Sequence, residues 1–150
     1  MKHILVTIDE DPQAEKVIAL AGEIAQKLGA HVTVFHVMAD EKYRRIEEEQ
    51  LHDQVEHPFT ITQAEEQARS FAAETAVPLR DMGVSFDVRG KVGDPPTEIL
   101  ALAQEIDADF IVMGFEGLHG LDRLRALGSV SRAVMEKTRR PALIVPALAE

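Results

Sequence analysis

Residues 109–129, DFIVMGFEGLHGLDRLRALGS, indicate a strand, a glycine-rich loop and the start of a helix. The apolar run from Phe110 to Met113 is typical of a strand buried on both faces of a parallel sheet. Gly114 and Gly117 follow it, where glycine lets the backbone turn or approach a ligand closely. Gly128-Ser129 then opens a helix whose free N–H groups and serine hydroxyl suit an anion. The stretch predicts a phosphate site, although a tight turn and plain helix capping by Ser129 would use the same atoms.

The rest of the chain alternates strand patterns with helix patterns. Helix starts are expected at Asp11-Pro12, at a capping box formed by Thr62 and Glu65, and at Asp94-Pro95. Residues 39–61 are highly charged, and their pattern fits either a short helix with a loop or a partly mobile segment. The alternation predicts one α/β domain over residues 1–150, with helices on both faces of a five-stranded, mostly parallel sheet. The expected strands are 4–8, 31–37, 84–88, 110–113 and 142–145.

Composition narrows the class of protein. The chain has 150 residues, 45% of them hydrophobic, and it contains no cysteine, which excludes disulfides and thiolate chemistry. Its net charge of −10 disfavours a nucleic-acid partner. We expect a cytoplasmic protein, because no run is long enough for a membrane span and no signal peptide is evident. Residues 120–141 are locally basic, which fits either a phosphate ligand or a solvated helix face.

With these motifs, the sequence resembles the universal stress protein family over essentially its whole length. The family's nucleotide motif is Gly, two residues, Gly, nine residues, then Gly-Ser or Gly-Thr. Gly114, Gly117 and Gly128-Ser129 match it, but the spacer of residues 118–127 has ten residues. Glu116 is a second departure, because ATP-binding members usually carry a neutral residue or His there. The resemblance implies strand order 3-2-1-4-5, which would place Asp9 and Gly114 on opposite sides of one crevice.

The resemblance also implies the residues of an ATP site. Asp9 would accept hydrogen bonds from the ribose, and the backbone of Val37 would contact adenine. A strand-end carboxylate and a core valine are the alternatives for these two residues. The predicted nucleotide-binding residues are Thr7, Asp9, Val37, Met113, Gly114, Gly117, Gly128, Ser129 and Val130.

Three functions follow from this resemblance, in order of preference. The first is a regulatory module that binds ATP, with or without Mg²⁺. The second is a dimeric universal stress protein that does not hold ATP and acts on a protein partner not yet identified. The third is a slow ATPase, for which Glu116 is the single supporting residue, because no catalytic residue is otherwise predicted. Glu116 works against ATP binding, and Mg²⁺, Arg123 or Arg125 would offset it.

Two further expectations concern metals and assembly. His52, Asp53, Glu56 and His57 lie at helical spacing, but without a further convergent ligand they predict a surface ion-pair face and no metal site. The resemblance implies a homodimer in which residues 142–145 pair with the same strand of a second copy, since an unpaired edge strand is a liability. Coverage of this strand by residues 147–150 is the alternative.

Overall fold

Five parallel strands form one sheet in the order β3-β2-β1-β4-β5 in the computed structural model, which describes residues 2–114 and 129–146. The order reverses between β1 and β4, which confirms the predicted fold class and the order that the resemblance implies. Apolar, β-branched runs form the three central strands. The strands are β1 (His3–Thr7), β2 (His31–Ala39), β3 (Phe86–Gly93), β4 (Phe110–Gly114) and β5 (Ala142–Val145).

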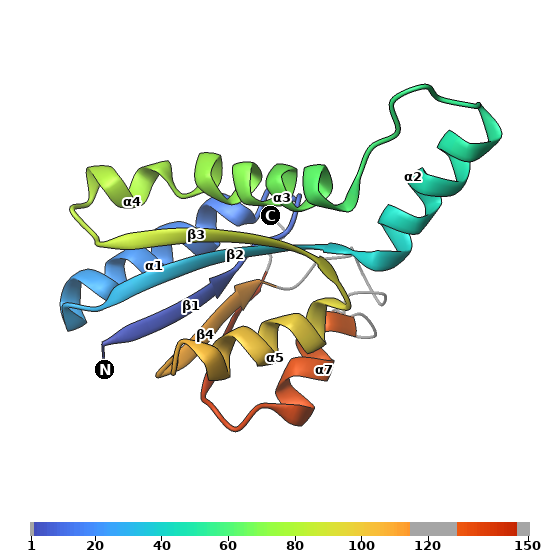
Figure 1. Cartoon of the computed structure of the whole chain (residues 1–150). Coiled ribbons are helices and arrows are strands. Elements are labelled where there is room, and N and C mark those ends of the chain that lie inside the picture. The colour runs from blue at the N-terminus through green and yellow to red at the C-terminus, as the bar shows by residue number, and fades with distance from the viewer. Residues whose placement is uncertain (1, 115–128, 147–150) are drawn as a thin grey trace.

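Helices cover both faces of the sheet (Figure 1). Helices α1 (Ala14–Leu28), α3 (Ile61–Thr75) and α4 (Val77–Asp81) pack on one face, where Ile4 and Val32 are fully buried. Helices α5 (Pro95–Glu105) and α7 (Ser129–Lys137) pack on the other face, over Leu5 and Ile111. The period of two along each strand therefore divides the core into two layers.

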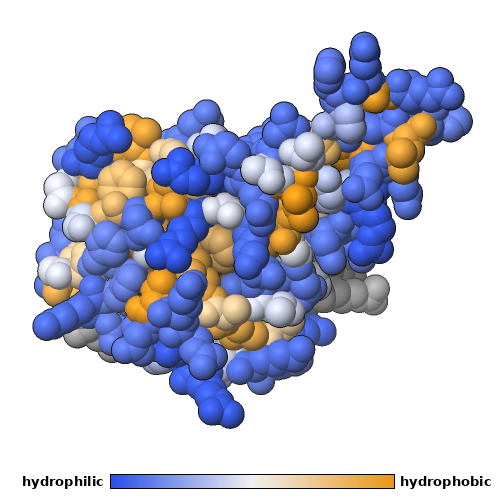
Figure 2. Space-filling view, in the orientation of Figure 1, coloured by the Kyte–Doolittle hydropathy of each residue, from blue (hydrophilic) through white to orange (hydrophobic). Residues whose placement is uncertain are grey.

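Helix α2 (Asp40–His52) projects from the body of the molecule, as Figure 1 shows. It has no buried residue, and Leu51 near its end is 76% exposed. The surface of this arm is mainly hydrophilic, with a few hydrophobic side chains (Figure 2). The helix ends at His52 and Gln54 has a φ of 52°, so His52 to His57 do not form the continuous helical face that their spacing predicts. Of the two interpretations of residues 39–61, the structure shows the helix followed by a loop.

Several predicted boundaries were wrong, including the ends of β1 and β2, and three of them have an identifiable physical cause. Helix α1 begins at Ala14 and not at Pro12, because Asp11 accepts a hydrogen bond from the Gln13 N–H and closes a turn before the helix. The capping box of α3 joins Thr60 to Gln63 and not Thr62 to Glu65. The carboxylate of Glu65 instead accepts a hydrogen bond from the Val92 N–H, 3.0 Å away, and ties α3 to β3. Residues 84–85 precede β3, which extends to Gly93 because the long β2 offers it a partner along its whole length.

The helix start expected at Asp94-Pro95 is confirmed. Asp94 caps α5, accepting a hydrogen bond from the Thr97 N–H at 3.3 Å. The chain breaks between α3 and α4 at Ala76, and Pro78 lies in the first turn of α4, where its missing N–H costs nothing. No helix within the described residues is both long enough and apolar enough to cross a bilayer.

Gly90 sets the distance between α3 and β3. A Cβ at this position would lie 2.7 Å from the carbonyl carbon of Ala68, and closer still to the backbone nitrogen of Arg69. Backbone atoms cannot move aside as a flexible side chain can, so α3 packs against the sheet only because residue 90 lacks a side chain.

We therefore expect Gly90→Ala to lower the free energy of unfolding by about 1–3 kcal/mol, the usual cost of overpacking. Urea unfolding followed by circular dichroism measures the change. Lys91→Ala, on the same strand, is the control, because its exposed ion pair with Glu98 contributes at most about 1 kcal/mol. A Gly90→Ala protein as stable as the parent would contradict the close approach.

Candidate functional site

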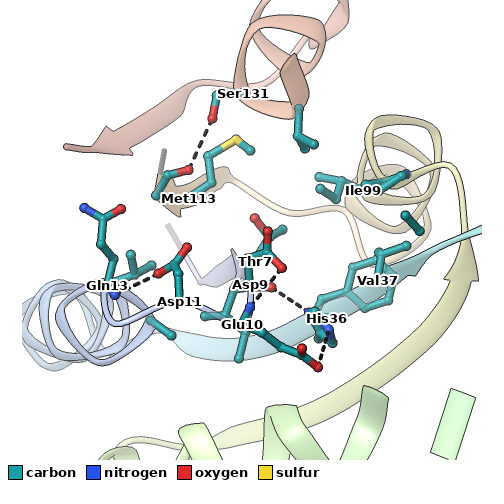
Figure 3. Close-up of a pocket in the computed structure, with 18 of the residues that line it drawn as sticks. Thr7, Asp9, Glu10, Asp11, Gln13, His36, Val37, Ile99, Met113 and Ser131 are labelled. Atoms are coloured by element: carbon teal, nitrogen blue, oxygen red, sulfur yellow. Dashed lines mark hydrogen bonds and ion pairs between the residues drawn. The ribbon is translucent and has the colours of Figure 1, made fainter. Parts of the chain in front are cut away.

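A pocket opens at the carboxyl ends of β1, β2 and β4, at the point where the strand order reverses. Its volume is about 270 Å³, close to the lower end of pockets that hold small ligands. In open parallel sheets this is the position where ligands bind, because the loops that follow neighbouring strands diverge there. Figure 3 shows the side chains that β1, β2 and β4 and the first turn of α7 contribute.

Seven of the nine predicted site residues line this pocket, although they come from distant parts of the chain. Gly117 and Gly128 lie outside the described residues, as does Glu116. Asp9 and Gly114 both line the pocket, as the strand order requires. The seven are Thr7, Asp9, Val37, Met113, Gly114, Ser129 and Val130.

The backbone of Val37 is exposed to the pocket because β1 is shorter than β2. The β1–β2 register ends with Thr7 opposite Phe35, whose carbonyl oxygen accepts a hydrogen bond from the Ile8 N–H at 3.0 Å. Backbone groups two residues apart on a strand point to the same side. The N–H and C=O of Val37 therefore point into the space beyond the end of β1. A donor and an acceptor side by side suit the edge of a heterocyclic base.

The β1–α1 loop places three carboxylates, Asp9, Glu10 and Asp11, around the pocket. The Asp9 carboxylate accepts a hydrogen bond from the Glu10 N–H at 2.8 Å and remains exposed. Glu10 pairs with Lys42 at 3.3 Å. This side of the pocket is therefore acidic and rich in hydrogen-bond acceptors, which suits hydroxyl groups.

Helix α7 begins at the opposite side of the pocket. Ser129, Val130 and Ser131 form its first turn and line the cavity, so their N–H groups have no partner within the helix. The hydroxyl of Ser131, which is buried, donates a hydrogen bond to the Gly114 carbonyl oxygen at 3.2 Å. This bond fixes the end of β4 relative to the helix. The partial positive charge of a helix N-terminus suits an anion there.

Among the pocket residues that sequence reasoning missed are two buried polar side chains, His36 and Ser131. His36 is buried, with Nδ1 2.9 Å from the Ile8 carbonyl oxygen and its ring against Phe71. Its Nε2 lies 3.9 Å from Glu10 Oε1, so His36 contacts both the residue that follows β1 and the β1–α1 loop (Figure 3). Ser131 is the second. A histidine inside an apolar strand and a second serine two residues after Ser129 were the available signals.

The fold and this pocket define an α/β protein with a small-ligand site at its topological switch point. The universal stress protein family model matches residues 1–146, and the chain belongs to that family. Universal stress protein A homolog 1 of Coxiella burnetii is 32% identical over 136 residues, which cover 89% of this chain and 88% of the relative.

Solved structures agree with this assignment. The universal stress protein of Archaeoglobus fulgidus in complex with dAMP is 26% identical, with a TM-score of 0.63 over 96% of this chain and 97% of that chain. A universal stress protein in complex with cAMP is 22% identical, with a TM-score of 0.65 over 97% of this chain and 96% of that chain. These relatives bind adenine nucleotides.

Proposed function

We propose that the pocket binds an adenine nucleotide, specifically ATP with or without Mg²⁺, and that the protein is a regulatory module whose partner interactions depend on the bound nucleotide. The observation that carries the proposal is the convergence of three features in one cavity. These are the unpaired backbone edge at Val37, the acceptor Asp9 and the N-terminus of α7. The complex of the Archaeoglobus fulgidus relative with dAMP supports the same assignment.

The three features fit the three parts of a nucleotide. The Val37 C=O would accept a hydrogen bond from the adenine amino group, and its N–H would donate one to ring nitrogen N1. Asp9 would accept hydrogen bonds from the ribose. Ser129 and Val130 would donate to phosphate oxygens, together with Gly117 and Gly128 of the predicted motif. In this arrangement the pocket needs no catalytic base, and no hydrolysis is part of the proposal.

Gly114 gives the first test. A Cβ at this position would lie 3.1 Å from Val17 Cγ2 and 3.4 Å from Gln13 Oε1, so the larger side chain of valine would be forced into the pocket. We expect Gly114→Val to weaken ATP binding at least about tenfold, or about 1.4 kcal/mol, in isothermal titration calorimetry.

The control for this substitution is Ala101→Val, which places the same side chain at an exposed position of α5. Its ATP affinity should match that of the parent. A folded Gly114→Val protein with unchanged affinity would contradict the assignment of the pocket.

Base selectivity gives the second test, because the Val37 backbone presents a fixed order of donor and acceptor. Guanine has an acceptor at O6 and a donor at N1, the reverse of adenine, so both contacts would be mismatched. We expect ATP to bind at least about tenfold more tightly than GTP, since a bidentate contact contributes about 1–3 kcal/mol of discrimination. Equal affinities measured in competition would remove Val37 from the base-reading role.

The proposal includes a homodimer through β5. This strand is at the edge of the sheet and pairs only with β4 among the described residues. Leu143, at its centre, is 38% exposed. An apolar edge strand of this kind is usually paired or covered.

We expect light scattering to give the mass of two chains for the parent protein and of one chain for Leu143→Arg, because a charge at the centre of the paired edge is costly to bury. Leu51→Arg, on the exposed α2 arm, is the matched control and should remain dimeric. A parent protein with the mass of one chain would exclude the dimer without affecting the nucleotide proposal.

A further inference from the structure

A second polar cluster lies at the other end of the sheet, where β1, β2 and β3 begin. His3 is opposite His31 in the β1–β2 register, and Asp87 is opposite Thr33 in the β2–β3 register. Three parallel strands thus bring together residues that are far apart in the sequence. The amino ends of these strands lie on the side of the N-terminus in Figure 1, away from the pocket at their carboxyl ends.

The distances within this cluster are those of a site with three converging ligands. One ligand atom each from His3, His31 and Asp87 lies within 4.8 Å of the other two. His31 Nε2 is 2.8 Å from Asp87 Oδ1, and the two imidazole rings meet edge to face at 5.1 Å. Ligand atoms around a tetrahedral zinc ion are about 3.4 Å apart, given a Zn–N distance of about 2.1 Å. Binding of an ion would require side-chain rotations that bring these atoms closer together.

His31 and Asp87 also have polar neighbours that would hold them in place. Ser85 Oγ is 2.7 Å from His31 Nδ1, the ring nitrogen that faces away from Asp87. Thr33, which is fully buried, donates its hydroxyl hydrogen to Asp87 Oδ1 and lies 2.7 Å from His3 Nε2. Outer partners of this kind orient the ligands of metal sites and fix the tautomer of a coordinating histidine.

From this geometry we propose that His3, His31 and Asp87 bind a divalent transition-metal ion of the zinc class. Two imidazoles and one carboxylate suit Zn²⁺ and similar transition-metal ions. Mg²⁺ and Ca²⁺ suit such a site less well, because they select oxygen ligands. Coordination by three protein groups leaves the remaining position to water.

The hydrogen bonds of the cluster indicate which ring nitrogens carry protons, and this arrangement can change to admit a metal ion. Asp87 Oδ1 accepts hydrogen bonds from Thr33 and His31, so Nε2 of His31 carries the proton in the metal-free protein. On metal binding that proton moves to Nδ1, where the Ser85 hydroxyl oxygen accepts it in a hydrogen bond. His3 changes tautomer in the same way, its Nε2 exchanging the Thr33 oxygen for the metal.

The pKa shifts of His3 and Asp87 agree with these proton positions. Burial, followed by the neighbouring His31, lowers the pKa of His3, so this ring is neutral at pH 7. Burial acts to raise the pKa of Asp87, but hydrogen bonds from Thr33, His31 and Arg89 outweigh it and lower the pKa. The carboxylate is therefore ionised over the whole physiological range.

Arg89 is the main charge that opposes a cation here. Its Nε lies 3.2 Å from Asp87 Oδ2, so the arginine contacts one carboxylate oxygen while the histidine contacts the other. Glu105 partly balances Arg89, at 3.6 Å from its Nη1. The side chains of His31 and Asp87 are 36% and 40% exposed, which gives a metal ion direct access from solvent.

The test is a titration of the full chain, without a polyhistidine tag and without nucleotide, with Zn²⁺ by calorimetry and with Co²⁺ by visible absorption. We expect saturable binding of one ion per chain and a rise in melting temperature with Zn²⁺, because the ion binds the folded state. Ser85→Ala should weaken binding about 10- to 100-fold, as outer-partner substitutions do. His31→Gln and Asp87→Asn should weaken it at least as much.

The control variant is His52→Gln/His57→Gln, which removes two exposed histidines outside the cluster and should bind as the parent does. Asp87→Asn keeps the shape of the side chain, so it remains informative if a histidine variant does not fold. Circular dichroism establishes that each variant is folded. Non-saturable binding, or binding that persists unchanged in Asp87→Asn or His3→Gln/His31→Gln, would overturn the proposal, whatever the outcome at the nucleotide pocket.

Discussion

The structure depends on the pairing of β1 with two neighbours of unequal length. β1 stops at Thr7, level with Met113 on β4, whereas β2 continues to Ala39. Since β4 lies on the other side of β1, the strand order reverses between them, and the cavity opens beyond the carboxyl ends of these two strands. The extra residues of β2 are paired on the β3 side only, which leaves the Val37 backbone facing this cavity. The reversal of strand order thus creates the pocket, and the difference in strand length between β1 and β2 creates the hydrogen-bonding edge at Val37.

The sequence predicted the strands well where burial dominates. β1 and β4 are nearly continuous apolar runs and β2 is mostly apolar, which is typical of strands in a sheet that is covered on both faces. The prediction was poorer for β3, whose Arg89, Gly90 and Lys91 do not form a strand pattern. Those residues are extended because β2 offers them a hydrogen-bonding partner. Residue 90 must be glycine because α3 approaches it closely. Both causes are tertiary, and neither can be detected in a local window of sequence.

The difference between local sequence signals and tertiary causes also separates the two sites. The pocket residues lie at or near the ends of strands or begin a helix, and the glycine pattern together with the family resemblance nominated seven residues that the structure brings together. The cluster of His3, His31 and Asp87 has no local signal, because each residue is a single polar side chain at the start of a strand. Only the register between β1, β2 and β3 joins them. The histidine-rich segment at His52 to His57 had the stronger sequence signal, yet the end of α2 separates its members.

The distribution of charge around the pocket favours one orientation for a bound nucleotide. Asp9, Glu10 and Asp11 gather at the β1 side, where a triphosphate would meet repulsion of about 1 kcal/mol per charge pair even in water. The N-terminus of α7 lies across the cavity and offers N–H groups with no acidic side chain in its first turn. A nucleotide bound as proposed would therefore have its lowest electrostatic energy with the nucleoside against β1 and β2 and the phosphates toward Ser129. The reverse orientation would place the phosphates beside three carboxylates and leave the donors of α7 unused.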